Sequence, residues 1–203
     1  FRNDRGTRRE LSYRQLHDEV ARIAAGLAAA GVVAGDRVAA YIPNLPEATI
    51  AMLATASLGA IWSSCSPDFG IHGVLDRFGQ IAPKVLMTAD GYLYGPKRFD
   101  SLQAVADVVA KLPSVERVVV VPYVSTNPDL SAFGSKATLW EKFGTPRAPL
   151  RFDAFPFDQP LYILYSSGTT GVPKCIVHGA GGTLLQHQKE HVLHTDIRRD
   201  DRV

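Results

Sequence analysis

The stretch that decides the fold is LYILYSSGTTGVPKCIVH, residues 161–178. The apolar run 161–164 predicts a strand, and residues 175–178 predict a second one. Between them, residues 165–174 contain two glycines, a proline, four small hydroxyl side chains and a single lysine. Glycine and proline are both unfavourable inside a helix or a strand. Residues 165–174 are therefore expected to form a loop that joins two strands.

The chemistry of this loop predicts phosphate binding. Gly168 and Gly171 permit positive φ and let a ligand approach the backbone closely. Successive backbone amides can form a concave anion site, and Lys174 adds a compact positive charge. Hydrogen bonds to a charged acceptor contribute roughly 1.5–3 kcal/mol each, so a few converging donors hold a polyphosphate. The hydroxyl donors are Ser166, Ser167, Thr169 and Thr170.

Two common phosphate-binding motifs are excluded by spacing. The NTPase P-loop requires G-x-x-x-x-G-K-[ST], whereas Gly168 and Gly171 are three residues apart and Lys174 does not follow a glycine. The dinucleotide fingerprint G-x-G-x-x-G is also absent. The remaining alternative is a loop without a ligand, which the crowding of glycine, serine and threonine disfavours.

Outward from the loop, helical and strand patterns alternate along the chain. Ser12 and Gln15 form a capping box before apolar residues spaced by three and four, and Gly31 ends that run. The wholly apolar run 118–121 suits a parallel sheet that is covered on both faces. The chain is therefore expected to be an α/β domain with a mostly parallel sheet. Expected helices cover residues 13–27, 44–58, 71–78, 102–112 and 182–193, and further expected strands cover 37–42, 60–62, 84–88 and 118–121.

Two segments break this alternation. Residues 122–160 contain six prolines and few periodic runs, so we expect a surface excursion with a short helix around 138–143. Residues 200–203 repeat the pattern of residues 35–38, which precede an expected strand. The chain end is therefore interpreted as the beginning of another strand, and the chain as part of a larger domain.

Composition narrows the class of protein. The 203 residues are 46% apolar and 21% charged, with a net charge of +2, which favours a folded domain and gives no reason to expect nucleic acid or an acidic membrane surface. Cys65 and Cys175 have no framework spacing, which favours a reducing compartment. The uncharged run 48–67 is better explained by a buried helix and strand than by a membrane span. We expect a soluble cytoplasmic protein.

Residues 165–174 resemble the signature loop of the adenylate-forming superfamily, which contains acyl-CoA synthetases, luciferases and peptide-synthetase adenylation domains. Earlier motifs at residues 11–13, 35–38 and 44–47 occur in a similar order. Within the superfamily, WSSCSPDFG at 62–70 and VLDRFGQI at 74–81 resemble the acetoacetyl-CoA synthetases most closely, and residues 90–92 and 176–179 agree with them. The resemblance covers nearly the whole chain.

The resemblance implies that residues 1–203 are the N-terminal part of a large adenylation domain. It also implies a two-step reaction, in which acetoacetate attacks the α-phosphate of ATP and coenzyme A then displaces AMP, with Mg²⁺ sharing the phosphate charge. The residues implied to bind the β- and γ-phosphates are Ser166, Ser167, Gly168, Thr169, Thr170, Gly171 and Lys174.

The superfamily's later motifs and its C-terminal adenylation lysine are not among these residues. We therefore expect no catalytic residue in the segment, no activity from the segment alone, and self-association through its uncovered surface. Two other functions stay open: another short-chain acyl-CoA synthetase, and a non-catalytic nucleotide-binding module.

Several other side chains have a structural explanation that competes with a functional one. His187, His191 and His194 share one side of the last expected helix, but the H-E-x-x-H zinc pattern is not met, so helix-surface histidines are expected. His178 is expected mainly as a packed histidine. The other such residues are Trp62 and Phe69, expected as core, and Asp76 and Arg77, expected on a solvated helix face.

Overall fold

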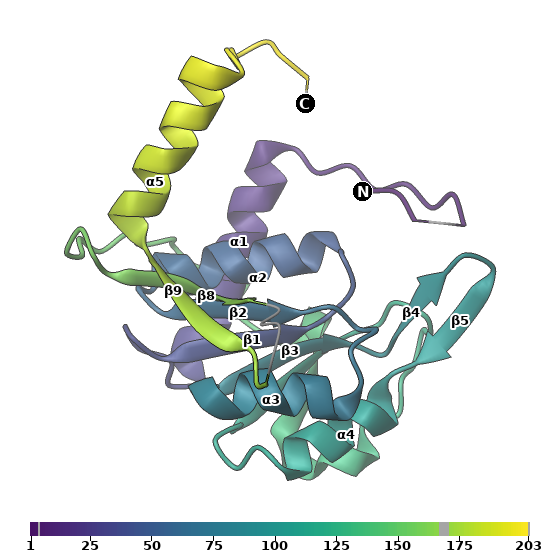
Figure 1. Cartoon of the computed structure of the whole chain (residues 1–203). Coiled ribbons are helices and arrows are strands. Elements are labelled where there is room, and N and C mark those ends of the chain that lie inside the picture. The colour runs from purple at the N-terminus through teal and green to yellow at the C-terminus, as the bar shows by residue number, and fades with distance from the viewer. Residues whose placement is uncertain (4, 167–170, 203) are drawn as a thin grey trace.

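A seven-stranded mixed sheet forms the centre of the molecule in a computed structural model that describes residues 1–3, 5–166 and 171–202 (Figure 1). The strand order is β7-β6-β3-β1-β2-β8-β9, and every neighbouring pair is parallel except β8 and β9. A separate antiparallel hairpin is formed by β4 and β5. The strands are β1 (Arg37–Tyr41), β2 (Ile61–Cys65), β3 (Val85–Ala89), β4 (Gly91–Tyr94), β5 (Lys97–Asp100), β6 (Arg117–Val121), β7 (Ala137–Leu139), β8 (Pro160–Ser166) and β9 (Lys174–Gly179).

Helices cover both faces of this sheet. In Figure 1, α1 and α2 lie on one face and α3 and α4 on the other, while α5 extends away from the sheet. The helices are α1 (Tyr13–Ala29), α2 (Pro46–Ser57), α3 (Ile71–Ile81), α4 (Leu102–Ala110) and α5 (Ala180–Gln188), which continues as a π-helical segment, Lys189–His194. Short 3₁₀ segments occur at Ser131–Lys136 and Trp140–Lys142. The predicted α/β class with a mostly parallel sheet is confirmed.

Local signals explain where the first two helices begin and end. The Ser12 hydroxyl accepts the Gln15 backbone N–H at 3.3 Å, and Gln15 Oε1 accepts the Ser12 N–H at 2.8 Å, so the predicted capping box is present. Gly31 follows α1 with φ of +79°, the left-handed conformation that ends many helices. Pro46 is the first residue of α2, where its missing N–H is not needed.

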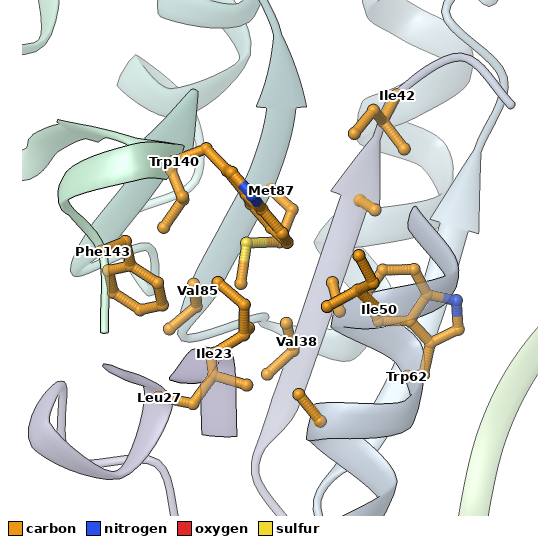
Figure 2. Packing of buried hydrophobic residues seen from close by; sticks show 14 of the residues in the cluster. Ile23, Leu27, Val38, Ile42, Ile50, Trp62, Val85, Met87, Trp140 and Phe143 are labelled. Atoms are coloured by element: carbon orange, nitrogen blue, oxygen red, sulfur yellow. The ribbon is translucent and has the colours of Figure 1, made fainter. Parts of the chain in front are cut away.

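Two apolar clusters form the core, one on each face of the sheet. On the first face, Ile23 and Leu27 of α1 pack against Val38, Val85 and Met87 of the central strands (Figure 2). On the second face, residues of α3 and α4 cover the sheet; they include Val74, Phe78, Val105 and Val108, all 0% exposed. All five residues of β3 are buried, because its side chains alternate between the two clusters.

Residues 122–160 do more than the predicted surface excursion. They add strand β7 to the edge of the sheet, and the side chains of Phe133, Trp140 and Phe143 are buried in the core. The guanidinium of Arg22 in α1 donates to the carbonyl oxygens of Trp140, at 2.9 Å, and of Phe143. The prediction of a surface segment therefore holds for most of residues 122–160 but missed β7 and these three buried side chains, and a short helical turn does occur at Trp140–Lys142, within the predicted 138–143. The apolar residues here follow no helix or strand period, so their burial could not be predicted from a local pattern.

Three further differences concern element boundaries. The hairpin of β4 and β5 was not predicted, and β2 continues to Cys65, beyond the predicted residues 60–62. Residues 200–202 form no strand and residue 203 lies outside the described residues, so the expected entry to a further strand stays a prediction. Within the described ranges, no helix has both the length and the apolar character needed to cross a membrane.

Candidate functional site

The carboxyl ends of the parallel strands meet at one edge of the sheet, where α/β folds bind their ligands. Strand β8 runs parallel to β2, so Ser166 lies at this edge. Strand β9 begins at Lys174 and returns antiparallel, with Lys174 paired directly to Ser166. The connection predicted to bind phosphate therefore leaves and rejoins the sheet at its carboxyl edge, where α/β folds bind their ligands.

Of the seven predicted phosphate-binding residues, three are described by the structure. Gly171 adopts φ of +95°, as the prediction of a positive-φ glycine requires, and no atom of the described residues would lie within 4 Å of a Cβ added there. The Lys174 side chain is exposed, and none of the carboxylates in the described ranges forms an ion pair with it. The other four, Ser167, Gly168, Thr169 and Thr170, lie outside the described residues, so phosphate binding by the loop stays a prediction.

Strand β8 is attached to the sheet by a buried serine. The Ser63 hydroxyl donates to the carbonyl oxygen of Ile163 at 2.9 Å and lies 3.0 Å from the Tyr165 hydroxyl. Burial raises the pKa of Tyr165 well above its usual range, so this phenol stays neutral. Sequence reasoning missed Ser63, because its partners are about 100 residues away in the chain.

A cleft of about 440 Å³ opens at the same edge, where the connections from β1 and β2 leave to opposite faces of the sheet. Such a switch point is the usual ligand position in an open α/β sheet. Aromatic residues of the β4–β5 hairpin form one wall, with the rings of Tyr92 and Phe99 stacked 4.8 Å apart. The lining residues are Pro43, Asn44, Ser66, Pro67, Asp68, Tyr92, Leu93, Tyr94 and Phe99.

A tyrosine holds the turn that borders this cleft. The Tyr41 hydroxyl lies 3.1 Å from the Pro67 carbonyl oxygen and 2.5 Å from that of Phe69. Burial, together with nearby Tyr92, raises the pKa of Tyr41, so the phenol remains a donor to these carbonyls. The turn after β2 is therefore fixed by a side chain at the end of β1.

Asp90 attaches the base of the β4–β5 hairpin, which forms a wall of this cleft, to the segment after β6. Its carboxylate is 1% exposed and accepts three backbone N–H groups, from Tyr123 at 2.8 Å, Val124 at 2.9 Å and Ser125 at 2.7 Å. The segment after β6 is thereby attached to the residue that precedes β4. Asp90, one of the residues in the family resemblance, thus has a structural role next to the cleft.

A larger cleft of about 640 Å³ lies between the N-terminal segment and α2. Its cation, Arg9, forms an ion pair with buried Glu47 at 2.7 Å. Because that charge is already neutralised, this cleft is a weaker candidate for binding a phosphate than the edge near Lys174.

The structure distinguishes the structural from the functional explanation for the side chains to which the sequence allowed both. Trp62 is buried, as expected, and the ring of partly buried His178 packs against Tyr162 at 5.1 Å. Phe69 is not core: it is 38% exposed, and the Arg77 guanidinium lies 4.2 Å from its ring centroid. Arg77 is half-buried, so the prediction of a solvated side chain was wrong for it, whereas Asp76 is exposed.

The three histidines of the last helix lie on its exposed surface. The rings of His187 and His191 are 6.0 Å apart. Among the residues with described positions, no three His, Cys, Asp or Glu side chains are grouped so that they could hold a metal ion.

Comparison with known protein families shows which family the chain belongs to. The sequence pattern of the family described as AMP-binding enzyme matches residues 2–203. The chain therefore belongs to the AMP-binding enzyme family, as the resemblance predicted.

Individual relatives within this family are acyl-CoA synthetases. The acetoacetyl-coenzyme A synthetase of Rhizobium meliloti is 52% identical over 200 residues, which are 96% of this chain and 30% of that protein. The acetoacetyl-CoA synthetase of Gallus gallus is 48% identical over 198 residues, 95% of this chain and 30% of that protein. The malonamoyl-CoA synthetase of Penicillium aethiopicum is 43% identical over 208 residues, 98% of this chain and 29% of that protein.

A solved structure of a related enzyme has the same fold as this chain. The acetoacetyl-CoA synthetase from Streptomyces lividans superimposes with a TM-score of 0.90 at 44% identity, over 96% of this chain and 29% of that one. The chain thus spans about 30% of the length of the relatives that it matches.

Proposed function

We propose that residues 1–203 are the N-terminal, phosphate-binding part of a longer enzyme that joins acetoacetate to coenzyme A at the expense of ATP. In the first step, a carboxylate oxygen of acetoacetate attacks the α-phosphorus of ATP, and the bond to the β-phosphate oxygen breaks. In the second step, the thiol of coenzyme A attacks the acyl carbon, loses its proton, and AMP leaves. The products are acetoacetyl-CoA, AMP and pyrophosphate.

This segment's contribution is electrostatic rather than covalent. The negative charge on the bridging oxygen and on the leaving pyrophosphate increases as the α–β bond breaks. A lysine ammonium, hydroxyl groups and backbone N–H groups fixed near that charge stabilise the transition state. The residues proposed for this role are Ser166, Ser167, Gly168, Thr169, Thr170, Gly171 and Lys174.

Mg²⁺ would arrive with the nucleotide. The described part of the chain offers no cluster of acidic side chains for it, and Mg²⁺ commonly binds through substrate phosphates with few protein ligands. Magnesium is therefore treated as part of the ATP substrate.

The observation that carries this proposal is the position of Lys174. It is paired to Ser166 at the carboxyl edge of a parallel sheet, with its side chain exposed and unpaired among the described residues. An exposed cation at that edge, without an ion-pair partner in the described ranges, supports the proposal that an anionic ligand binds there. The 52% identity to an acetoacetyl-coenzyme A synthetase supports acetoacetate as the acid.

The proposal is tested with the full-length protein by ATP–pyrophosphate exchange, driven separately by acetoacetate, acetate, propionate and malonamate. Acetoacetate is expected to give the highest kcat/KM. Lys174→Ala is expected to lower kcat/KM for ATP at least tenfold, since a charge-assisted hydrogen bond contributes roughly 1.5–3 kcal/mol. Lys111→Ala, at an exposed lysine that follows α4, is the matched control and should leave kcat/KM unchanged.

Malonamate is included because of the 43% identity to a malonamoyl-CoA synthetase. The two acids differ only in a terminal methyl against an amino group. A site that discriminates between them must leave the amide unsatisfied or provide it with partners. A preference for malonamate, acetate or propionate would contradict the substrate assignment, and ATP binding without exchange would favour a non-catalytic module.

A further inference from the structure

One glutamine of α3 contacts both sides of Lys174. The Gln80 amide nitrogen donates to the carbonyl oxygen of Pro173 at 2.8 Å, and its second hydrogen goes to the Asp76 carbonyl at 2.5 Å. The Gln80 amide oxygen accepts the thiol of Cys175, with Sγ 3.6 Å away. A single side-chain amide therefore fixes the residue before Lys174 and the residue after it.

Strand β8 of the β8–β9 hairpin is contacted by Arg77, which lies three residues before Gln80 on α3. The Arg77 guanidinium lies 5.7 Å from the ring centroid of Tyr165 and 4.2 Å from that of Phe69. It also donates to the Gly73 carbonyl at 2.7 Å, and no carboxylate in the described part of the chain pairs with it. Tyr165 in turn is the partner of Cys175 across the β8–β9 ladder. Arg77 and Gln80 thus reach the two strands at neighbouring positions.

These contacts differ from ordinary core packing. Gln80 is exposed, and fixing an exposed glutamine side chain in one rotamer costs conformational entropy. Exposed glutamines normally keep that freedom, whereas this one uses its donors and its acceptor within a single geometry. Figure 1 shows α3 beside the beginning of β9, so the helix is placed to act on the hairpin.

We propose that Gln80 and Arg77 are positioning residues, which set where Ser166 and Lys174 stand at the carboxyl edge to meet the polyphosphate of a nucleotide. This inference rests on the proposed function. Neither residue needs to touch the nucleotide. A displacement of about 1 Å can reduce a rate about 100-fold. A helix that fixes the backbone at residues 173–175 therefore determines how closely the Lys174 ammonium approaches the phosphates.

The test uses the full-length enzyme with Gln80→Met, which keeps the side-chain length and removes the donors and the acceptor. The KM for ATP and the Kd for pyrophosphate are expected to rise about tenfold, since the two neutral hydrogen bonds that join Gln80 to Pro173 and Cys175 are lost. The KM for the acid and the melting temperature should stay close to wild type. Arg77→Met is expected to shift the same two constants in the same direction.

The matched control is Gln103→Met on α4. Gln103 is also an exposed helical glutamine, and its amide donates to Asp107 Oδ1 at 2.9 Å, away from the hairpin. If Gln80→Met and Gln103→Met give the same KM for ATP while the wild type uses ATP normally, the positioning role is overturned and the proposed function stands. If the wild type itself binds neither ATP nor pyrophosphate, the proposed function is overturned, and this inference with it.

Discussion

Replacing Asp90 by asparagine is expected to loosen the segment after β6 and the wall of the switch-point cleft. The Asp90 carboxylate has two oxygens, of which Oδ1 accepts the N–H groups of Tyr123 and Val124 while Oδ2 accepts that of Ser125. Asparagine keeps one acceptor oxygen and puts an NH₂ group in place of the other. In the better of its two orientations, two hydrogen bonds survive and a donor faces the Ser125 N–H.

The expected loss of local stability follows from the number of hydrogen bonds that are lost. Losing one hydrogen bond to a charged acceptor costs about 1.5–3 kcal/mol, and the unsatisfied N–H adds to it. We expect Asp90→Asn to lower the free energy of local opening at residues 123–125 by about 3 kcal/mol. Asp90→Ala removes both acceptor oxygens and all three hydrogen bonds and should cost more. We expect only about 4 kcal/mol, because water reaches these part-buried amides and compensates in part.

Native-state hydrogen exchange in the full-length protein measures this directly. A loss of about 3 kcal/mol makes the Tyr123, Val124 and Ser125 amides exchange about 100-fold faster. Asp107→Asn, at a surface position of α4 whose carboxylate accepts only a neighbouring glutamine amide, is the control and should change protection by less than 0.5 kcal/mol. If Asp90→Asn exchanges like the wild type, or if Asp90→Ala is milder than Asp90→Asn, the hydrogen-bond argument is refuted.

Three other predictions concern packing, titration and association. Gly144→Ala is expected to destabilise the protein by at least 2 kcal/mol in chemical denaturation, because φ is +94° and an added Cβ would lie 2.1 Å from a backbone oxygen of α1; Gly79→Ala, with open space in α3, should be neutral or slightly stabilising. Burial raises the pKa of Cys65 from 9 to about 12, so iodoacetamide at pH 8 should modify Cys175 well before Cys65. Because the folded state favours the neutral thiol, its stabilisation is complete below pH 9 and declines as the pH rises towards 12; equal labelling of the two thiols would contradict this. The isolated 203-residue chain is expected to self-associate through exposed apolar side chains of α5 and its extension, and Leu193→Glu, at a leucine that is 75% exposed, should shift sedimentation towards monomer; a monomeric wild-type profile at high concentration would refute it.

The sequence alone was sufficient for the fold class and for the position of the proposed phosphate loop. The helix beginning after Ser12 was predicted because a capping box and an apolar period are local signals within a few residues. The buried strand β6 was predicted from the wholly apolar run 118–121, which suits a parallel sheet that is covered on both faces. The loop at 165–174 was found from its composition, because glycine, hydroxyl side chains and lysine are crowded between two strand patterns.

What only the tertiary structure decided is which residues support that loop and its neighbouring cleft. Gln80 contacts Pro173 across 93 residues, Ser63 contacts Ile163 across 100, and Arg22 reaches Trp140 across 118. A single polar side chain has no period and no cap, so nothing near it in the sequence reveals a partner that distant. The Ser63 pair exists because the sheet places β8 next to β2. The Gln80 pair exists because α3 lies beside the beginning of β9 (Figure 1), and the Arg22 pair because α1 and Trp140 share one face of the sheet. These neighbourhoods arise from the burial of both faces of the sheet together.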